Sequence, residues 1–191
     1  MKKRIFKSGI ILLLILVALV LIPQTRRTIK QAINTVRVIL FLPPINSVNV
    51  GDELTPFTYQ LTNLEGDLNP IGIGKGRVTF ISYWATWCPP CIVELPSIQE
   101  LYNDYGDKID FVLITEEKPE VVDRFLKKKQ LTLPVVFPNM ETPESLLERS
   151  IPTNYLIDQT GKVIMKEKGE GDWSRTLVRE TLDSLLLNGA K

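Results

Sequence analysis

Two cysteines separated by two residues are the side chains in this sequence best suited to covalent chemistry. Cys88 and Cys91 are the only cysteines among 191 residues, and they end the stretch Trp-Ala-Thr-Trp-Cys-Pro-Pro-Cys. A thiolate is the nucleophile of disulfide exchange, and its pKa falls in Cys-x-x-Cys arrangements. This spacing also keeps Cys91 close enough to attack a mixed disulfide formed on Cys88. The pair therefore predicts redox chemistry.

Other interpretations of the cysteine pair fit the chain less well. A structural zinc site requires about four ligands, but the chain has no histidine and no third cysteine. Haem attachment requires a histidine directly after the second cysteine, and the next residue is Ile92. A purely structural disulfide at this spacing would close almost no loop and would gain little from chain entropy. We therefore expect neither a structural metal site nor a cofactor.

A strand and a helix must position the two cysteines. Residues 78–83 have the apolar, β-branched and aromatic composition of a buried strand. Apolar residues recur at helical spacing after Cys91, and Pro89 suits a first helical turn, where a missing N–H costs little. Cys88 thus falls at a helix N-terminus, where unpaired N–H groups and the helix dipole favour a thiolate. We expect Cys88 to be accessible to solvent and Cys91 to be shielded.

The remaining pattern predicts one α/β domain over residues 48–191. A small strand or hairpin is expected in residues 48–64 and a turn in the glycine-rich residues 72–76. Further elements follow in order: strands at residues 109–114, 134–137, 153–158 and 162–167, and helices at residues 119–129, 143–149 and 173–187. In the helix at 119–129, the residues expected to face inward are Val121, Val122, Phe125 and Leu126. This order implies a mixed sheet covered on both faces.

The first 47 residues differ sharply from the rest in charge. They carry eight Lys and Arg and no Asp or Glu, and residues 8–25 carry no charge at all. This uncharged run could be a membrane-spanning helix or the core of a signal peptide. No small-x-small cleavage site follows it, so we interpret residues 1–25 as a basic cytoplasmic tip and an uncleaved anchor. The positive-inside count is nearly a tie.

Residues 26–47 are interpreted as a juxtamembrane segment or linker. Within them, residues 28–42 carry an apolar helical stripe with basic residues beside it. This pattern favours an amphipathic helix on anionic lipid, which would extend the membrane contact to residues 8–42. A helical stalk packed on the following domain is the alternative. The basic run at residues 127–129 is better explained as a solvated helix end than as a nucleic-acid site.

Residues 83–91, together with Pro96 and the later Ile151-Pro152-Thr153, resemble the thioredoxin superfamily. Within that superfamily, Cys-Pro-Pro-Cys followed by Ile-Val-Glu-Leu-Pro at residues 92–96 is similar to the TlpA/ResA group of membrane-anchored, extracytoplasmic thiol–disulfide oxidoreductases. The resemblance covers residues 48–188. It implies a thioredoxin-like α/β fold in which helices flank a mixed central sheet, preceded here by an N-terminal anchor helix.

The resemblance also implies roles for individual residues. Cys88 would be the nucleophile and Cys91 the resolving thiol. Pro152 matches the cis-proline that faces the cysteines, and Glu94 matches an acidic residue placed behind them. Position 82 is Ser82, where cytosolic thioredoxins carry a buried Asp, and this favours Glu94 as the proton-handling group. The alternative for Glu94 is a solvent-facing helix carboxylate. The residues expected to contact substrate are Trp87, Pro89, Ile151 and Pro152.

Three functions compete for this domain. The first is an extracytoplasmic oxidoreductase that reduces or rearranges disulfides of exported proteins, with a role in cytochrome c maturation, and is recharged by a membrane or extracytoplasmic thiol donor. The second is a thiol peroxidase, but the Pro-x-x-x-Thr-x-x-Cys site of peroxiredoxins would need Pro and Thr where Ile81 and Ala85 stand. The third is a non-enzymatic module in which two thiolates hold Cu(I), although such relatives also use a histidine.

Overall fold

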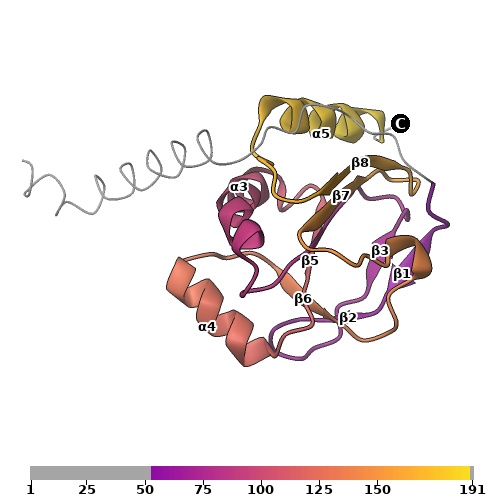
Figure 1. The fold of residues 1–191 in the computed structure, drawn as a ribbon. Coiled ribbons are helices and arrows are strands. Elements are labelled where there is room, and N and C mark those ends of the chain that lie inside the picture. The colour runs from indigo at the N-terminus through magenta and orange to yellow at the C-terminus, as the bar shows by residue number, and fades with distance from the viewer. Residues whose placement is uncertain (1–52, 190–191) are drawn as a thin grey trace, which may run out of the picture. The chain divides into compact units, whose positions relative to one another are not determined.

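A computed structural model describes residues 53–189 (Figure 1). The predicted strand before the cysteines and the predicted helix after them form β4 and α3. Within these residues the elements are β1 (Phe57–Tyr59), β2 (Leu61–Thr62), β3 (Ile71–Ile73), β4 (Thr79–Tyr83), α3 (Pro89–Tyr105), β5 (Asp110–Ile114), α4 (Pro119–Lys129), β6 (Val135–Pro138), the 3₁₀ turn η1 (Glu144–Leu146), β7 (Thr153–Ile157), β8 (Val163–Lys168) and α5 (Thr176–Asn188).

The main sheet of the described chain has the strand order β2-β6-β5-β4-β7-β8, and β1 and β3 form a separate antiparallel pair. β4 runs parallel to β5 and antiparallel to β7. β5 runs parallel to β6, whereas β8 is antiparallel to β7. The predicted mixed sheet is therefore confirmed. Its central strand, β4, leads directly into the cysteine loop.

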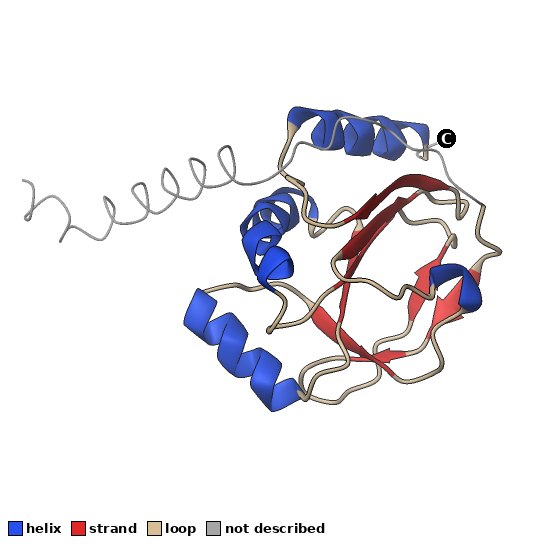
Figure 2. Cartoon of the chain, viewed as in Figure 1, coloured by secondary structure: helices blue, strands red, loops and turns tan. Residues whose placement is uncertain are grey.

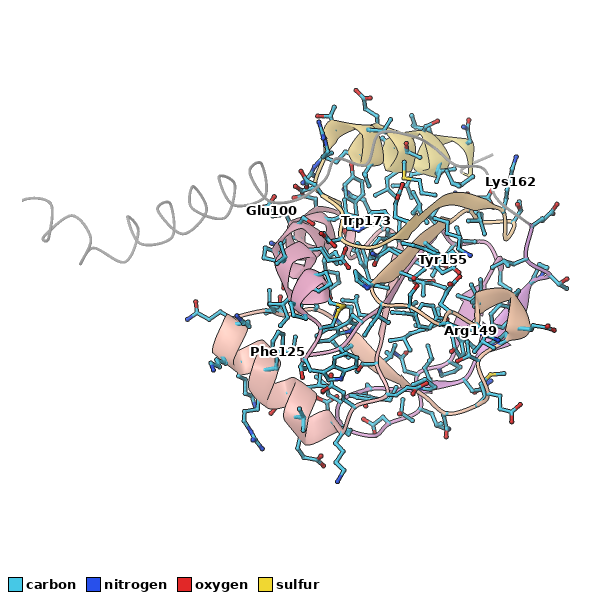
Figure 3. All side chains as sticks on the ribbon, in the orientation of Figure 1. Glu100, Phe125, Arg149, Tyr155, Lys162 and Trp173 are labelled. Carbon is cyan, nitrogen blue, oxygen red and sulfur yellow. A yellow bond between two sulfur atoms is a disulfide. The ribbon has the colours of Figure 1, made fainter. Side chains whose placement is uncertain are left out.

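Two apolar cores lie on the two faces of this sheet. One contains the buried faces of α3, α4 and α5 together with Phe80 and Trp173. The other contains Tyr155 and is covered by β1, β3 and the segment around η1. Figure 2 shows this division, with the α-helices gathered on one side, and Figure 3 shows Trp173 and Tyr155 pointing into the interior from their separate positions. In the described residues, α-helices thus flank one face of the sheet and strands cover the other.

The structure corrects several details of the expected elements. The helix expected at residues 143–149 is only the three-residue turn η1, and the final helix begins at Thr176 rather than at Trp173. Residues 72 and 73 belong to β3, so the turn in residues 72–76 is shorter than expected. In α4, Val121 is 41 % exposed rather than inward-facing, because Val122 and Leu126 already occupy the buried stripe.

The predicted membrane anchor at residues 8–25 and the juxtamembrane segment at residues 26–47 lie outside the described residues. Among residues 53–189, no helix is both long enough and apolar enough to cross a membrane.

Candidate active site

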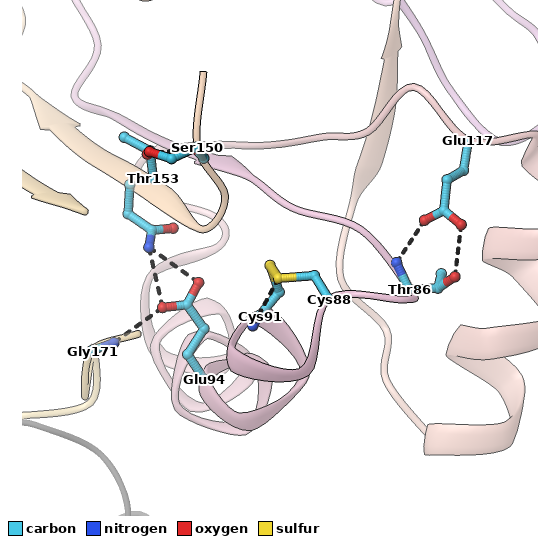
Figure 4. The surroundings of a disulfide bond; sticks show 9 residues. Thr86, Cys88, Cys91, Glu94, Glu117, Ser150, Thr153 and Gly171 are labelled. Carbon is cyan, nitrogen blue, oxygen red and sulfur yellow. Dashed lines mark hydrogen bonds between the residues drawn. A yellow bond between two sulfur atoms is a disulfide. The ribbon is translucent and has the colours of Figure 1, made fainter. Parts of the chain in front are cut away.

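Cys88 is the residue that caps the N-terminus of α3. Its backbone is extended (φ −89°, ψ 106°), and its Sγ accepts a hydrogen bond from the Cys91 N–H at 3.3 Å. Pro89 stands at the start of the helix, where a proline sacrifices no hydrogen bond. Cys88 and Cys91 are joined as a disulfide (Figure 4). The helix terminus therefore offers an N–H group to the sulfur that would carry the thiolate in the reduced protein.

The two sulfur-bearing residues are both buried in this oxidised form. Cys91 is 0 % exposed, as expected, but Cys88 is only 3 % exposed. The expected open access to Cys88 is therefore wrong for the disulfide state, because Cys88 belongs to the same buried core as Cys91 and Trp84. Trp87 is 69 % exposed directly before Cys88. Trp84 is a core residue whose ring packs on Phe125.

Glu94 is fully buried on α3, one turn beyond Cys91. The Asn154 side-chain amide donates to both carboxylate oxygens at 3.1 Å, and the Gly171 N–H donates to Oε2 at 3.2 Å (Figure 4). Burial raises the pKa of Glu94 to about 8, although the hydrogen bonds from Asn154 and Gly171 act in the opposite direction. The alternative of a solvent-facing carboxylate is thus excluded.

Little in the sequence indicated that Asn154 would bind Glu94. Asn154 lies in β7 directly opposite Ser82 of β4, and both residues are buried. Ser82 Oγ has no hydrogen-bond partner among the described residues, so Ser82 forms no hydrogen bond with Glu94. The signal that could have pointed to Asn154 is a single amide in a strand whose other residues are β-branched, aromatic or aliphatic.

The Ile151–Pro152 peptide bond is cis, as the resemblance implied. Pro152 directly precedes Thr153, which pairs with Tyr83 at the end of β4. This register brings Pro152 to the edge of the sheet from which the cysteine loop departs. Ile151 packs against the core that contains both cysteines. Pro89 is exposed beside Cys88. The contact of the expected residues with substrate stays a prediction.

A second carboxylate holds the cysteine loop from the other side. Glu117, in the loop after β5, accepts hydrogen bonds from the Thr86 N–H at 2.6 Å and from the Thr86 hydroxyl at 2.7 Å (Figure 4). Thr86 lies two residues before Cys88, so this contact restrains the approach to the helix. Sequence reasoning missed the pair because 31 residues separate its members.

The chain is similar to known proteins over the residues that form this domain. A family model described as Redoxin matches residues 49–185. The chain belongs to the Redoxin family. The thiol-disulfide oxidoreductase ResA of Oceanobacillus iheyensis is 32 % identical over 168 residues, which cover 85 % of this chain and 81 % of that protein. ResA of Bacillus thuringiensis is 33 % identical over 126 residues, covering 64 % and 72 %.

A solved structure is also similar to this chain. The crystal structure of StoA from Bacillus subtilis matches with a TM-score of 0.52 at 28 % identity, over 66 % of this chain and 97 % of that one. The protein is therefore a ResA-like thiol–disulfide oxidoreductase with a thioredoxin-like fold. In the described part of the chain, no cluster of three or more Cys, Asp or Glu side chains is arranged to hold a metal ion.

Proposed function

We propose that this Redoxin-family enzyme reduces or rearranges disulfides of exported proteins through a mixed disulfide on Cys88. The observation that carries the proposal is the asymmetry of the pair. Cys88 caps α3 and its sulfur accepts an N–H from the helix, whereas Cys91 lies one turn inside with no exposed surface. The outer thiol is therefore the one favoured as a thiolate.

The proposed reaction consists of two exchange steps. In the reduced enzyme, the Cys88 thiolate attacks one sulfur of the substrate disulfide, forms a mixed disulfide and releases the other sulfur as a thiolate. Cys91 then loses its proton and attacks Cys88 Sγ. The second step releases the remaining substrate sulfur and leaves the Cys88–Cys91 disulfide seen in the structure. Two electrons pass to the substrate, and a thiol donor in the membrane or outside the cytoplasm returns them.

Glu94, in its ionised form, is proposed to take the proton that Cys91 must lose. Its carboxylate is buried on the same helix as Cys91, three residues further along. A group whose pKa lies near 8 can exchange protons with a thiol in neutral solution, because the two affinities for the proton are similar. The contacts from Asn154 and Gly171 hold the carboxylate in place during this exchange.

The setting we propose is the outer side of a cell membrane. Residues 8–25 would span the bilayer once, with the N-terminus in the cytoplasm, and residues 26–42 would lie on lipid. Disulfides persist outside the cytosol, which suits an enzyme that acts on exported proteins. Apocytochrome c is the substrate we propose to test first, because the resemblance to the TlpA/ResA group suggests it.

Trapping of the mixed disulfide tests the function. Cys91→Ser removes the resolving thiol, so the enzyme should accumulate a covalent complex with exported proteins on non-reducing gels, and dithiothreitol should release it. Cys88→Ser should form no such complex, and the double variant serves as the background control. If Cys91→Ser captures no exported protein and the purified wild-type enzyme fails to reduce insulin, the proposal is wrong.

A further inference from the structure

Glu148 is a buried carboxylate that the exchange reaction does not use. Its side chain is only 7 % exposed, yet it lies in the irregular segment between β6 and β7. Lys166 Nζ lies 2.6 Å from Oε1, Lys168 Nζ lies 2.9 Å from Oε2, and the Tyr155 hydroxyl donates to Oε1. We call Glu148, Tyr155, Lys166 and Lys168 the ionic latch.

The hydrogen bonds and ion pairs of the ionic latch keep Glu148 ionised. Burial alone would raise the pKa of Glu148, but hydrogen bonds from Lys166, Tyr155 and Lys168 outweigh it and lower the pKa to about 2. Lys166 also lies over the Tyr155 ring, with its Nζ 4.9 Å from the ring centroid. Charge and packing therefore fix the carboxylate at one place on β8.

The strand β8 also holds the chain four residues after Glu148. The Gly169 N–H donates to the Pro152 carbonyl oxygen at 2.9 Å, and Gly169 follows Lys168 directly. Residues 148 and 152 are thus tied to the same end of β8. Between them, Arg149 and Ser150 are exposed, and the Thr153 hydroxyl donates to the Ser150 carbonyl oxygen.

Residues 149–152 belong to no helix or strand that could hold them without the ionic latch. Where a helix was expected at residues 143–149, the structure has only the single turn η1, which ends at Leu146. Leu146 is buried in the core opposite the helices, so the segment is anchored before Glu148 as well. The position of residues 149–151 along the edge of the active site therefore depends on Glu148 and on Pro152.

We propose that Glu148 is a positioning residue for polypeptide substrates: the ionic latch holds residues 149–152 in the conformation that receives a polypeptide beside the disulfide. This inference rests on the proposed reduction of protein disulfides. A small disulfide needs only to reach Cys88 Sγ, whereas a polypeptide must also fit against the chain at Ile151 and Pro152. Loss of the ionic latch should therefore weaken the binding of the polypeptide substrate and leave the reaction with a small disulfide unchanged.

The experiment compares two substrates in full-length, detergent-solubilised enzyme. For Glu148→Gln, we expect the KM for insulin reduction to rise about tenfold with little change in kcat, because a misplaced contact surface costs binding before it costs chemistry. The single-turnover rate of the reduced variant with 5,5′-dithiobis(2-nitrobenzoate) should stay at the wild-type value, as should the Cys88–Cys91 reduction potential. Lys168→Arg, which keeps the charge, and Glu144→Gln, at an exposed position of η1, are the matched controls.

Each outcome decides the inference. An unchanged KM for insulin in Glu148→Gln overturns it, and so does an equal loss with both substrates, which would indicate general damage to the site. Should Glu148→Gln fail to fold, Lys168→Met replaces it, because that side chain is 57 % exposed, and the same split in KM is expected. A wild-type enzyme that reacts with the small disulfide but never with insulin would overturn the proposed function itself.

Discussion

Glu94 illustrates how two opposing effects act on one residue. Removal from water favours the protonated carboxyl group, whereas the N–H donors of Asn154 and Gly171 favour the carboxylate. Burial is the larger effect, so the pKa of Glu94 lies near 8 and the group holds its proton through most of the neutral range. The protonated carboxyl group can give a proton to a departing thiolate, and the ionised form present near pH 8 can accept one from a thiol.

Replacement of Glu94 by Gln should change the pH dependence of thiol reactivity. Gln has the same shape but exchanges no proton, so the alkylation rate of the reduced enzyme with iodoacetamide should lose the inflection near pH 8, and insulin reduction should slow. Coupled groups titrate together, so the lost step belongs to the thiols and Glu94 as a set. Glu100→Gln, on the same helix, is the control. An unchanged profile would contradict the proposed proton transfer.

The same substitution should flatten the stability of the oxidised enzyme against pH. The pKa of Glu94 is raised from 4.5 to about 8 on folding, so the favourable contribution of the proton is present below pH 4.5 and is lost as pH rises toward 8. This loss is on the order of 4 kcal/mol. Urea unfolding at pH 5 and pH 9 should show it in the wild type and not in Glu94→Gln.

At the scale of elements, the turn between β7 and β8 packs against the chain before β1. Gly161 has φ +104°, and a Cβ placed there would stand 2.5 Å from the Leu54 carbonyl oxygen. The Leu54 N–H also donates to the Gly161 carbonyl at 2.9 Å. The approach of these two backbones therefore requires glycine.

Gly161→Ala should destabilise the enzyme by about 2–3 kcal/mol, because backbone strain and the clash with Leu54 add together. Gly66→Ala is the matched control: its φ is +87°, but no atom lies within 4 Å of the added Cβ, so only about 1 kcal/mol of backbone strain is expected. Urea unfolding of both variants measures the difference. Equal losses would show that the contact with Leu54 contributes nothing.

The sequence predicted best those elements whose local signals agree. The apolar strand, the prolines and the helical spacing around Cys88 all indicate one arrangement, and β4 and α3 follow it closely. The segment at 143–149 shows the opposite case. Its spacing favours a helix, but Glu148 pairs instead with two lysines of β8, far away in the sequence. No local pattern reveals that competition.

The candidate site divides in the same way. Cys88, Cys91 and Pro152 belong to short motifs and could be placed from the sequence alone. Asn154 could not, because its contact with Glu94 joins residues 60 positions apart and arises from the pairing of β4 with β7. The burial of Cys88 was also missed, since it depends on the disulfide and on the packing of the cysteine loop into the core.

For the whole molecule, we predict that the thiols face the outside of the cell on a protein retained in the membrane. The uncharged residues 8–25 favour retention in the membrane. The positive-inside count is nearly a tie, so the redox pair, which suits a compartment where disulfides persist, favours this orientation. A membrane-impermeant maleimide should label the reduced protein in intact cells, or in spheroplasts where an outer membrane is present. A Lys3→Cys variant lacking Cys88 and Cys91 should react only after lysis. The reverse pattern would show that the orientation is wrong.

The position of β4 in the sheet also determines when the site can form during synthesis. β4 is central, but the residues of β7 that pair with it lie 70 to 78 positions later in the chain. Long-range pairing of this kind slows folding. Cys88 and Cys91 therefore leave the ribosome well before Asn154 and Gly171, the residues that hold Glu94. A disulfide formed on the nascent chain would therefore form before Asn154 and Gly171 can bind Glu94.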